Sequence, residues 1–113
     1  MIGLWKDRSE KISLIGKTLS GEIRTKIALL LYEEECMSIS QIAETIGESL
    51  GLVSHHVGIM KDRGMVIEEE SGREHLISLS PLLYWSIRGL VRAVVEEEEI
   101  AEIEEEERGD EVE

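Results

Sequence analysis

Two short helical patterns, separated by only two residues, constrain the fold of this chain more than any other feature of its sequence. Ser38 and Gln41 have the spacing of a capping box, and apolar residues then recur at helical intervals until Gly47. Ser49 can cap a second helix, which ends at Gly64. Two short helices joined by a tight turn that contains glycine form a helix-turn-helix arrangement.

The segment after the second helix has the pattern of a β-hairpin. Residues 65–70 and 74–79 are rich in β-branched and apolar side chains, and they flank the short connection Ser71-Gly72-Arg73. A hairpin directly after a helix-turn-helix makes a winged helix. We therefore expect a mainly α fold with a small β-hairpin wing, which is a winged helix-turn-helix.

Three further helices are expected around this unit. The first covers residues 3–17, and the second follows Ser20, a good N-cap residue, and ends at the glutamates 33–35. The third begins at Ser80-Pro81, because an N-cap followed by proline at the first helical position is a strong start signal, and it continues through Val94. Glutamate dominates beyond this point, and like charges at i,i+4 repel, so we expect fraying after about residue 103.

The formal net charge of −13 argues at first against binding to duplex DNA, because affinity for a polyanion depends on Lys and Arg. The acidity is, however, confined to one end of the chain. Residues 1–95 contain 11 Lys and Arg against 13 Asp and Glu, whereas residues 96–113 contain one Arg against 12 acids. We therefore expect one domain over residues 1–95 and an acidic tail over residues 96–113, partly helical or disordered. With the acidity assigned to the tail, the charge no longer excludes DNA.

The chain resembles the ArsR-type winged helix-turn-helix transcription regulators over residues 16–95. The resemblance is densest in an opening helix, in the first helix of the helix-turn-helix, and in its second helix with the step into the wing. These segments are LSGEIRTKIALL (19–30), SISQIAETIG (38–47) and VSHHVGIMKDRGMV (53–66). The resemblance implies a homodimeric, sequence-specific DNA-binding protein, usually a repressor, with its terminal helices at the dimer interface. Related winged-helix families such as MarR remain an alternative.

The resemblance and the helical pattern together indicate how the domain would meet DNA. We expect helix 49–63 to enter the major groove and wing 65–79 to contact the backbone or the minor groove. Ser54 and His55 are the best candidates for hydrogen bonds to base edges or phosphates, and the basic residues are candidates for phosphate contacts. The expected DNA-binding residues are Ser49, Gly51, Ser54, His55, Gly58, Lys61, Arg63, Arg73 and His75.

Some residues of this surface allow two interpretations. Gly51 and Gly58 each cost about 1 kcal/mol relative to Ala in a helix, so they either permit a close approach to DNA or are merely tolerated on an exposed face. The segment Leu50-Gly51-Leu52 offers no side chain that bonds base edges, and Glu68-Glu69-Glu70 places acids on the wing. Sequence preference would then be weak, or would depend on DNA shape.

Residues 83–95 are more apolar than the outer helix of one small domain requires. Their apolar side chains follow a 4-3-4 spacing, which suits pairing with a second helix. We therefore expect dimerisation through the terminal helices, and the alternative is a long helix folded back on its own domain. The expected interface residues are Leu4, Trp5, Leu83, Trp85, Ile87, Leu90, Val91 and Val94.

Several functions find no support in the sequence. A single cysteine, Cys36, excludes an internal disulfide, and the adjacent His55 and His56 point about 100° apart on a helix, so we expect no metal and no cofactor. No phosphate-binding glycine loop or Ser/His/Asp arrangement is present, so we expect no enzyme. No apolar run suits a membrane span, and no signal peptide is evident. We expect a cytoplasmic protein whose partners are double-stranded DNA and a second copy of itself.

Two alternative hypotheses concern the acidic tail. In the first, the chain is a winged-helix protein–protein adaptor that has lost DNA binding and uses residues 96–113 on a basic protein partner. In the second, the tail mimics DNA and competes for the protein's own basic face. Deleting residues 96–113 would abolish capture of a basic partner under the first hypothesis, and would tighten DNA binding at low salt under the second.

Overall fold

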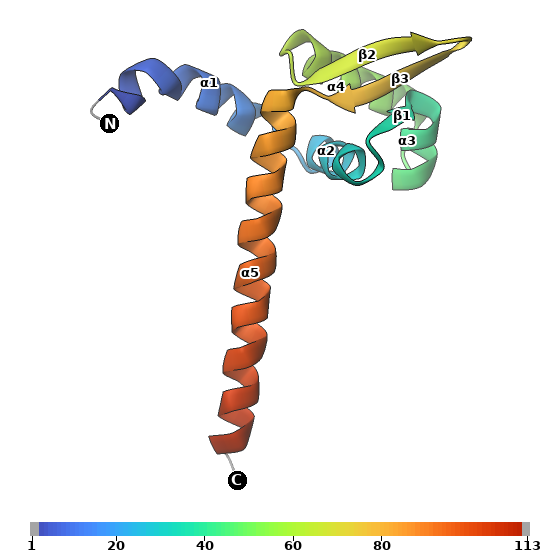
Figure 1. Cartoon of the computed structure of the whole chain (residues 1–113). Helices are drawn as coiled ribbons and strands as arrows, with labels where there is room; N and C mark the ends of the chain where they lie inside the picture. The colour runs from blue at the N-terminus through green and yellow to red at the C-terminus, as the bar shows by residue number, and fades with distance from the viewer. Residues whose placement is uncertain (1–2, 112–113) are drawn as a thin grey trace.

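The computed structural model describes residues 3–111, which form five helices and three strands (Figure 1). Residues 1, 2, 112 and 113 of the expected domain and tail lie outside the described residues. The elements are α1 (Leu4–Thr18), α2 (Glu22–Glu34), β1 (Cys36–Ser38), α3 (Ile39–Ile46), α4 (Leu50–Asp62), β2 (Val66–Ser71), β3 (Glu74–Leu79) and α5 (Pro81–Glu111).

The turn between α3 and α4 is fixed by local hydrogen bonds, as the sequence predicts. Ser38 forms a complete capping box with Gln41, because its hydroxyl accepts from the Gln41 amide and the Gln41 side chain accepts from the Ser38 amide. Gly47 ends α3 with φ 73°, a left-handed conformation that glycine adopts without steric cost. Ser49 then caps α4 by accepting from the Leu52 amide. These bonds orient α4 relative to α3.

The wing is part of a three-stranded antiparallel sheet with strand order β1-β3-β2. The β2–β3 hairpin agrees with the prediction, but β1 was not predicted. It pairs with β3 in a register that places Met37 opposite Ile77. The expected cap at Ser20 is wrong: Gly21 occupies the N-cap position of α2 without a side-chain cap, and the Ser20 hydroxyl donates to the Lys17 carbonyl oxygen instead.

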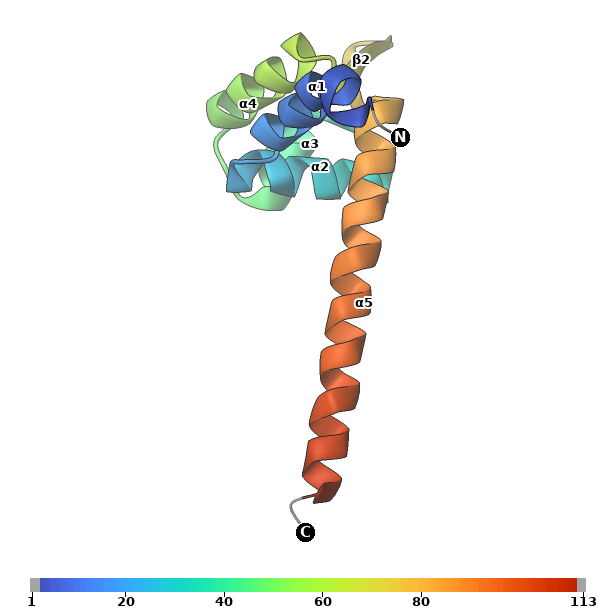
Figure 2. The same cartoon turned by 90° about the vertical axis from the view of Figure 1, so that its left-hand side faces the viewer.

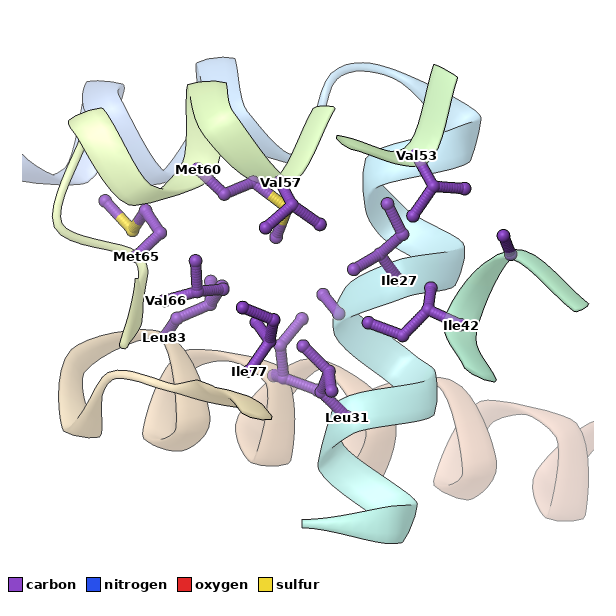
Figure 3. Close-up of a cluster of buried hydrophobic side chains, with 13 residues drawn as sticks. Ile27, Leu31, Ile42, Val53, Val57, Met60, Met65, Val66, Ile77 and Leu83 are labelled. Carbon is purple, nitrogen blue, oxygen red and sulfur yellow. The ribbon is translucent and has the colours of Figure 1, made fainter. Parts of the chain in front are cut away.

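The core lies between α2, the two helices of the helix-turn-helix, the sheet and the start of α5 (Figure 3). Ile27 and Leu31 of α2 contribute its centre, and Ile42 of α3 and Val53 of α4 pack against them. Ile77 brings the sheet into the same cluster. These five side chains are no more than 1% exposed, so the orientation of α4 depends on packing as well as on its cap.

The first turns of α5 belong to the domain core. Leu83 is fully buried and Ile87 is 2% exposed, so both pack within a single chain. The expectation that they contribute to a dimer surface is therefore corrected. Their spacing is equally suited to packing against α2 and β3, which the sequence alone did not distinguish. The other expected interface residues, Leu4, Trp5, Trp85, Leu90 and Val94, are exposed and Val91 is half-buried.

The remainder of α5 is a long helix that extends away from the domain (Figures 1 and 2). It continues to Glu111, so the expected fraying after about residue 103 is wrong. Glutamate and alanine have high helix propensity, and no proline interrupts the segment, which outweighs the repulsion between like charges. No helix in the part of the chain that the structure describes has the length and apolarity needed to cross a membrane.

Candidate nucleic-acid interface

An open groove lies between the start of α4 and the wing. Its volume is about 510 Å³. It is lined by Ser54 of α4, Arg73 of the turn between β2 and β3, and His75 of β3. All three side chains are exposed. The structure thus brings together three of the residues that the sequence nominated for DNA contact.

The outer face of α4 carries the other nominated residues of that helix. Val53, Val57 and Met60 are buried on one side of α4, and His55 is exposed on the opposite side. The Ser49 hydroxyl is occupied by the cap of α4, so its role in this structure is to begin the helix.

Lys61 and His75 share one carboxylate. The Lys61 ammonium pairs with Oε2 of Glu68, and His75 Nδ1 lies 3.5 Å from Oε1 of the same residue. The hydrogen bond from Lys61 lowers the pKa of Glu68, and the same bond raises the pKa of Lys61. Both groups therefore stay charged at neutral pH, and the positive charge of this face is partly neutralised by the protein itself.

Arg63 lies outside the groove. Its guanidinium Nη1 is 3.4 Å from Oγ1 of Thr18, a buried residue at the end of α1. In this structure the Arg63 side chain ties α4 to α1, and its expected contact with phosphate stays a prediction. The sequence could not distinguish this role, since the two residues are 45 positions apart.

A second arginine connects the same helices. Arg24 of α2 donates from Nε to the Thr18 carbonyl oxygen at 2.8 Å, and its Nη1 lies 3.1 Å from Nδ1 of His56. His56 is half-buried on α4, and burial together with the positive charge of Arg24 lowers its pKa. The neutral imidazole is the form that can accept from the guanidinium. The sequence alone does not reveal this partner, because Arg24 and His56 are 32 positions apart.

Acid is expected to destabilise the fold through His56. Its pKa in the folded chain lies below the ordinary 6.5, so the unfolded chain takes up a proton first as the pH falls. The stabilisation is complete above about 6.5 and is lost as the pH falls through the folded-state pKa. Thermal unfolding at pH 7.5 and 5.5 measures this loss. His56→Gln keeps an acceptor for Arg24, and its melting temperature should fall less between the two pH values; an equal fall would assign the loss to other groups.

The two glycines of α4 allow a direct test of close approach. A Cβ at Gly51 or Gly58 would meet no atom of the chain within 4 Å, so folding does not require either glycine. We expect Gly58→Ala to stabilise the domain by about 1 kcal/mol, because alanine has the higher helix propensity. If the helix backbone approaches DNA, the same variant binds DNA more weakly. Gly16→Ala in α1, which is equally unobstructed, is the matched control and should leave DNA affinity unchanged.

Several groove residues were not nominated from the sequence. Ser38, Ile39 and Ser40 line the groove because the start of α3 faces the wing, which only the tertiary arrangement shows. Leu50 and Glu68 were noted only as departures from a standard DNA-binding surface, and both line the groove. No group of three or more His, Cys, Asp or Glu side chains in the described part of the chain is placed to hold a metal ion.

These elements define a winged helix-turn-helix, in which α3 and α4 form the helix-turn-helix and the β2–β3 hairpin forms the wing. Solved transcription regulators share this fold, which confirms the expected winged helix-turn-helix. HlyU from Vibrio cholerae superimposes with a TM-score of 0.72 at 20% identity, over 78% of this chain and 96% of that chain. The transcriptional repressor BigR from Xylella fastidiosa gives 0.69 at 18% identity, over 79% and 90% of the two chains.

A third similar structure is a homodimeric winged helix-turn-helix DNA-binding domain from Mycobacterium bovis, described as part of a possible ArsR-family regulator. It gives a TM-score of 0.68 at 23% identity, over 82% of this chain and 89% of that chain. BigR and the Mycobacterium bovis domain give the adaptor hypothesis no support, since one is a repressor and the other belongs to a possible regulator. No protein-family model and no curated protein matches the sequence.

Proposed function

We propose that this protein is a dimeric, sequence-specific DNA-binding transcription regulator that acts in the cytoplasm as a repressor. The observation that carries the proposal is the groove in which Ser54, Arg73 and His75 meet on one exposed face of a winged helix. Helix α4 would enter the major groove of DNA, where Ser54 and His55 reach base edges. The wing would place Arg73 on the backbone or in the minor groove.

The dimer is supported by a second, apolar groove between α2 and α5. Leu19 and Leu29 line it from the α1–α2 region, and Leu90, Val91 and Val94 line it from α5, around a volume of about 430 Å³. Leu90 and Val94 are each 52% exposed in the single chain. Exposed apolar side chains around a groove are typical of a protein–protein interface. A homodimeric structure with the same fold supports a dimer, and we assign this apolar groove to the second copy.

The repressor role rests on similarity and on geometry. BigR, which has the same fold, is a transcriptional repressor. A dimer that covers two adjacent half-sites would also hinder access of other proteins to the same DNA. The acidic part of α5 extends away from the α4–wing groove, so it does not cover that groove in the same chain (Figures 1 and 2). The competition hypothesis for the tail therefore requires contact between different chains.

Selection from a random duplex library tests the proposal. The full-length protein should enrich a two-fold symmetric sequence whose half-sites are about 10 base pairs, or a multiple of this, apart. Arg73→Ala should recover the same sequence with lower affinity, because a phosphate contact positions the protein without specifying bases. Failure to enrich any sequence over several rounds would contradict sequence-specific binding.

A further inference from the structure

Glu68 contacts two of the residues proposed to bind DNA. Both of its oxygens are engaged, Oε2 by Lys61 of α4 and Oε1 by His75 of β3. Its side chain is 24% exposed, whereas those of Lys61 and His75 are 53% and 54% exposed. The acid therefore lies beneath two more exposed basic groups and ties the recognition helix to the wing.

The strand register explains why Glu68, and not its neighbour Glu69, has this position. Glu68 pairs with Ile77, and directly paired residues project from the same face of a sheet, so Glu68 lies on the side of the core and of α4. Glu69 pairs with Leu76, and its side chain projects from the opposite face because strand residues alternate. Glu69 is exposed, and no ion pair involves it among the described residues.

A carboxylate in this position resembles a phosphate that is already bound. Lys61 donates to an anionic oxygen, as it would to a DNA phosphate, and the low pKa of Glu68 keeps that anion present at neutral pH. A cation that is paired internally releases fewer counterions when DNA arrives. A DNA phosphate near Lys61 would also be repelled by Glu68 unless the carboxylate withdraws.

We propose that Glu68 is an intramolecular competitor of the DNA backbone, and that DNA binding exchanges the Lys61–Glu68 contact for a Lys61–phosphate contact. Glu68 thereby sets the affinity and the salt dependence of binding. The inference rests on the proposed function, since it assigns a regulatory residue to the same surface. It also gives the acidic wing, which departs from a standard DNA-binding surface, a role in limiting affinity for unrelated DNA.

Glu68→Gln separates charge from shape. Glutamine has nearly the same size and can still accept a hydrogen bond from Lys61. Because it carries no negative charge, it holds the Lys61 ammonium less strongly, and the ammonium becomes free to pair with a phosphate. The matched control is Glu69→Gln, which makes the same change in net charge on the same strand but on the other face. Thermal unfolding of each variant establishes that it is folded before binding is measured.

Fluorescence anisotropy with the full-length protein and a random-sequence duplex, at several salt concentrations, tests the inference. For each Lys61 that is released, Glu68→Gln should increase the affinity for DNA about tenfold at 0.1 M salt. The slope of log affinity against log salt should also become more negative by about 0.9 for each released Lys61. Glu69→Gln should change both quantities much less. In the Lys61→Ala background, Glu68→Gln should lose most of its effect.

The outcomes distinguish this inference from the proposed function. If wild-type protein binds with a salt-dependent affinity but the two glutamine variants behave alike, Glu68 is no competitor and the proposed function stands. If Glu68→Gln increased DNA affinity just as much in the Lys61→Ala background, the proposed exchange of Glu68 for a phosphate at Lys61 would also be wrong. If neither wild-type protein nor any variant binds duplex DNA, the proposed function itself fails.

Discussion

Replacing Leu90 and Val94 together by aspartate is expected to convert the dimer into monomers and to weaken DNA binding about 10²- to 10⁴-fold. Both residues are half-exposed on α5 and line the apolar groove that we assign to a second copy. A buried aspartate without a partner is costly at an interface, so the variant should not associate. A dimer binds DNA more tightly than a monomer because its two linked domains contact two half-sites at once. A monomeric variant loses this increase in affinity.

Sedimentation equilibrium measures the mass, and anisotropy measures the affinity for a two-half-site duplex. Ile103→Asp is the matched control, because Ile103 is exposed on the same helix but does not line the groove. This control should remain dimeric and bind DNA normally. A dimer that survives both substitutions at positions 90 and 94 would place the interface on another surface of the chain.

Truncating Ile42 to alanine should cost about 2–5 kcal/mol of folding free energy. Ile42 is fully buried where α3 meets α2 and α4, close to Ile27 and Val53 (Figure 3). Its removal leaves a cavity at the point that fixes the orientation of the recognition helix. Small domains have a total stability of about 5–15 kcal/mol, so the melting temperature should fall by roughly 10–25 °C.

Ile67→Ala on β2 is the comparison for this variant, because Ile67 is 42% exposed and creates no internal cavity. Chemical denaturation should show a loss of at most about 1 kcal/mol for this control. Equal losses for the two variants would mean that Ile42 does not occupy the centre of the core.

The parts of the fold that were predictable are those encoded by neighbouring residues. The capping box at Ser38, the left-handed turn at Gly47 and the cap at Ser49 each depend on a few adjacent positions, and all three are confirmed. Strand β1 was missed because three residues carry too little pattern and its partner strand β3 lies far along the chain. The burial of Leu83 likewise depends on the packing of α5 against other elements of the same chain, which neighbouring residues do not encode.

In the candidate site, too, features encoded by nearby residues were predictable and contacts between distant residues were not. Helical periodicity placed Ser54 on the outer face of α4, and the order of elements placed Arg73 at the wing tip beside it. The ion pair of Glu68 and the two arginine contacts to Thr18 could not be predicted, because they join residues that are distant in sequence. Charge composition was least informative until the acids were assigned to the end of α5, away from the groove.

The affinity of the full-length protein for duplex DNA as a function of salt concentration tests the central claim most directly. Each phosphate neutralised by Lys or Arg contributes about −0.9 to the slope of log affinity against log salt. One contact from Arg73 in each of two subunits already predicts a slope of about −2, and further contacts make it steeper. A slope near zero, or no binding at low salt, would contradict the assignment of the α4–wing groove as a DNA-binding surface.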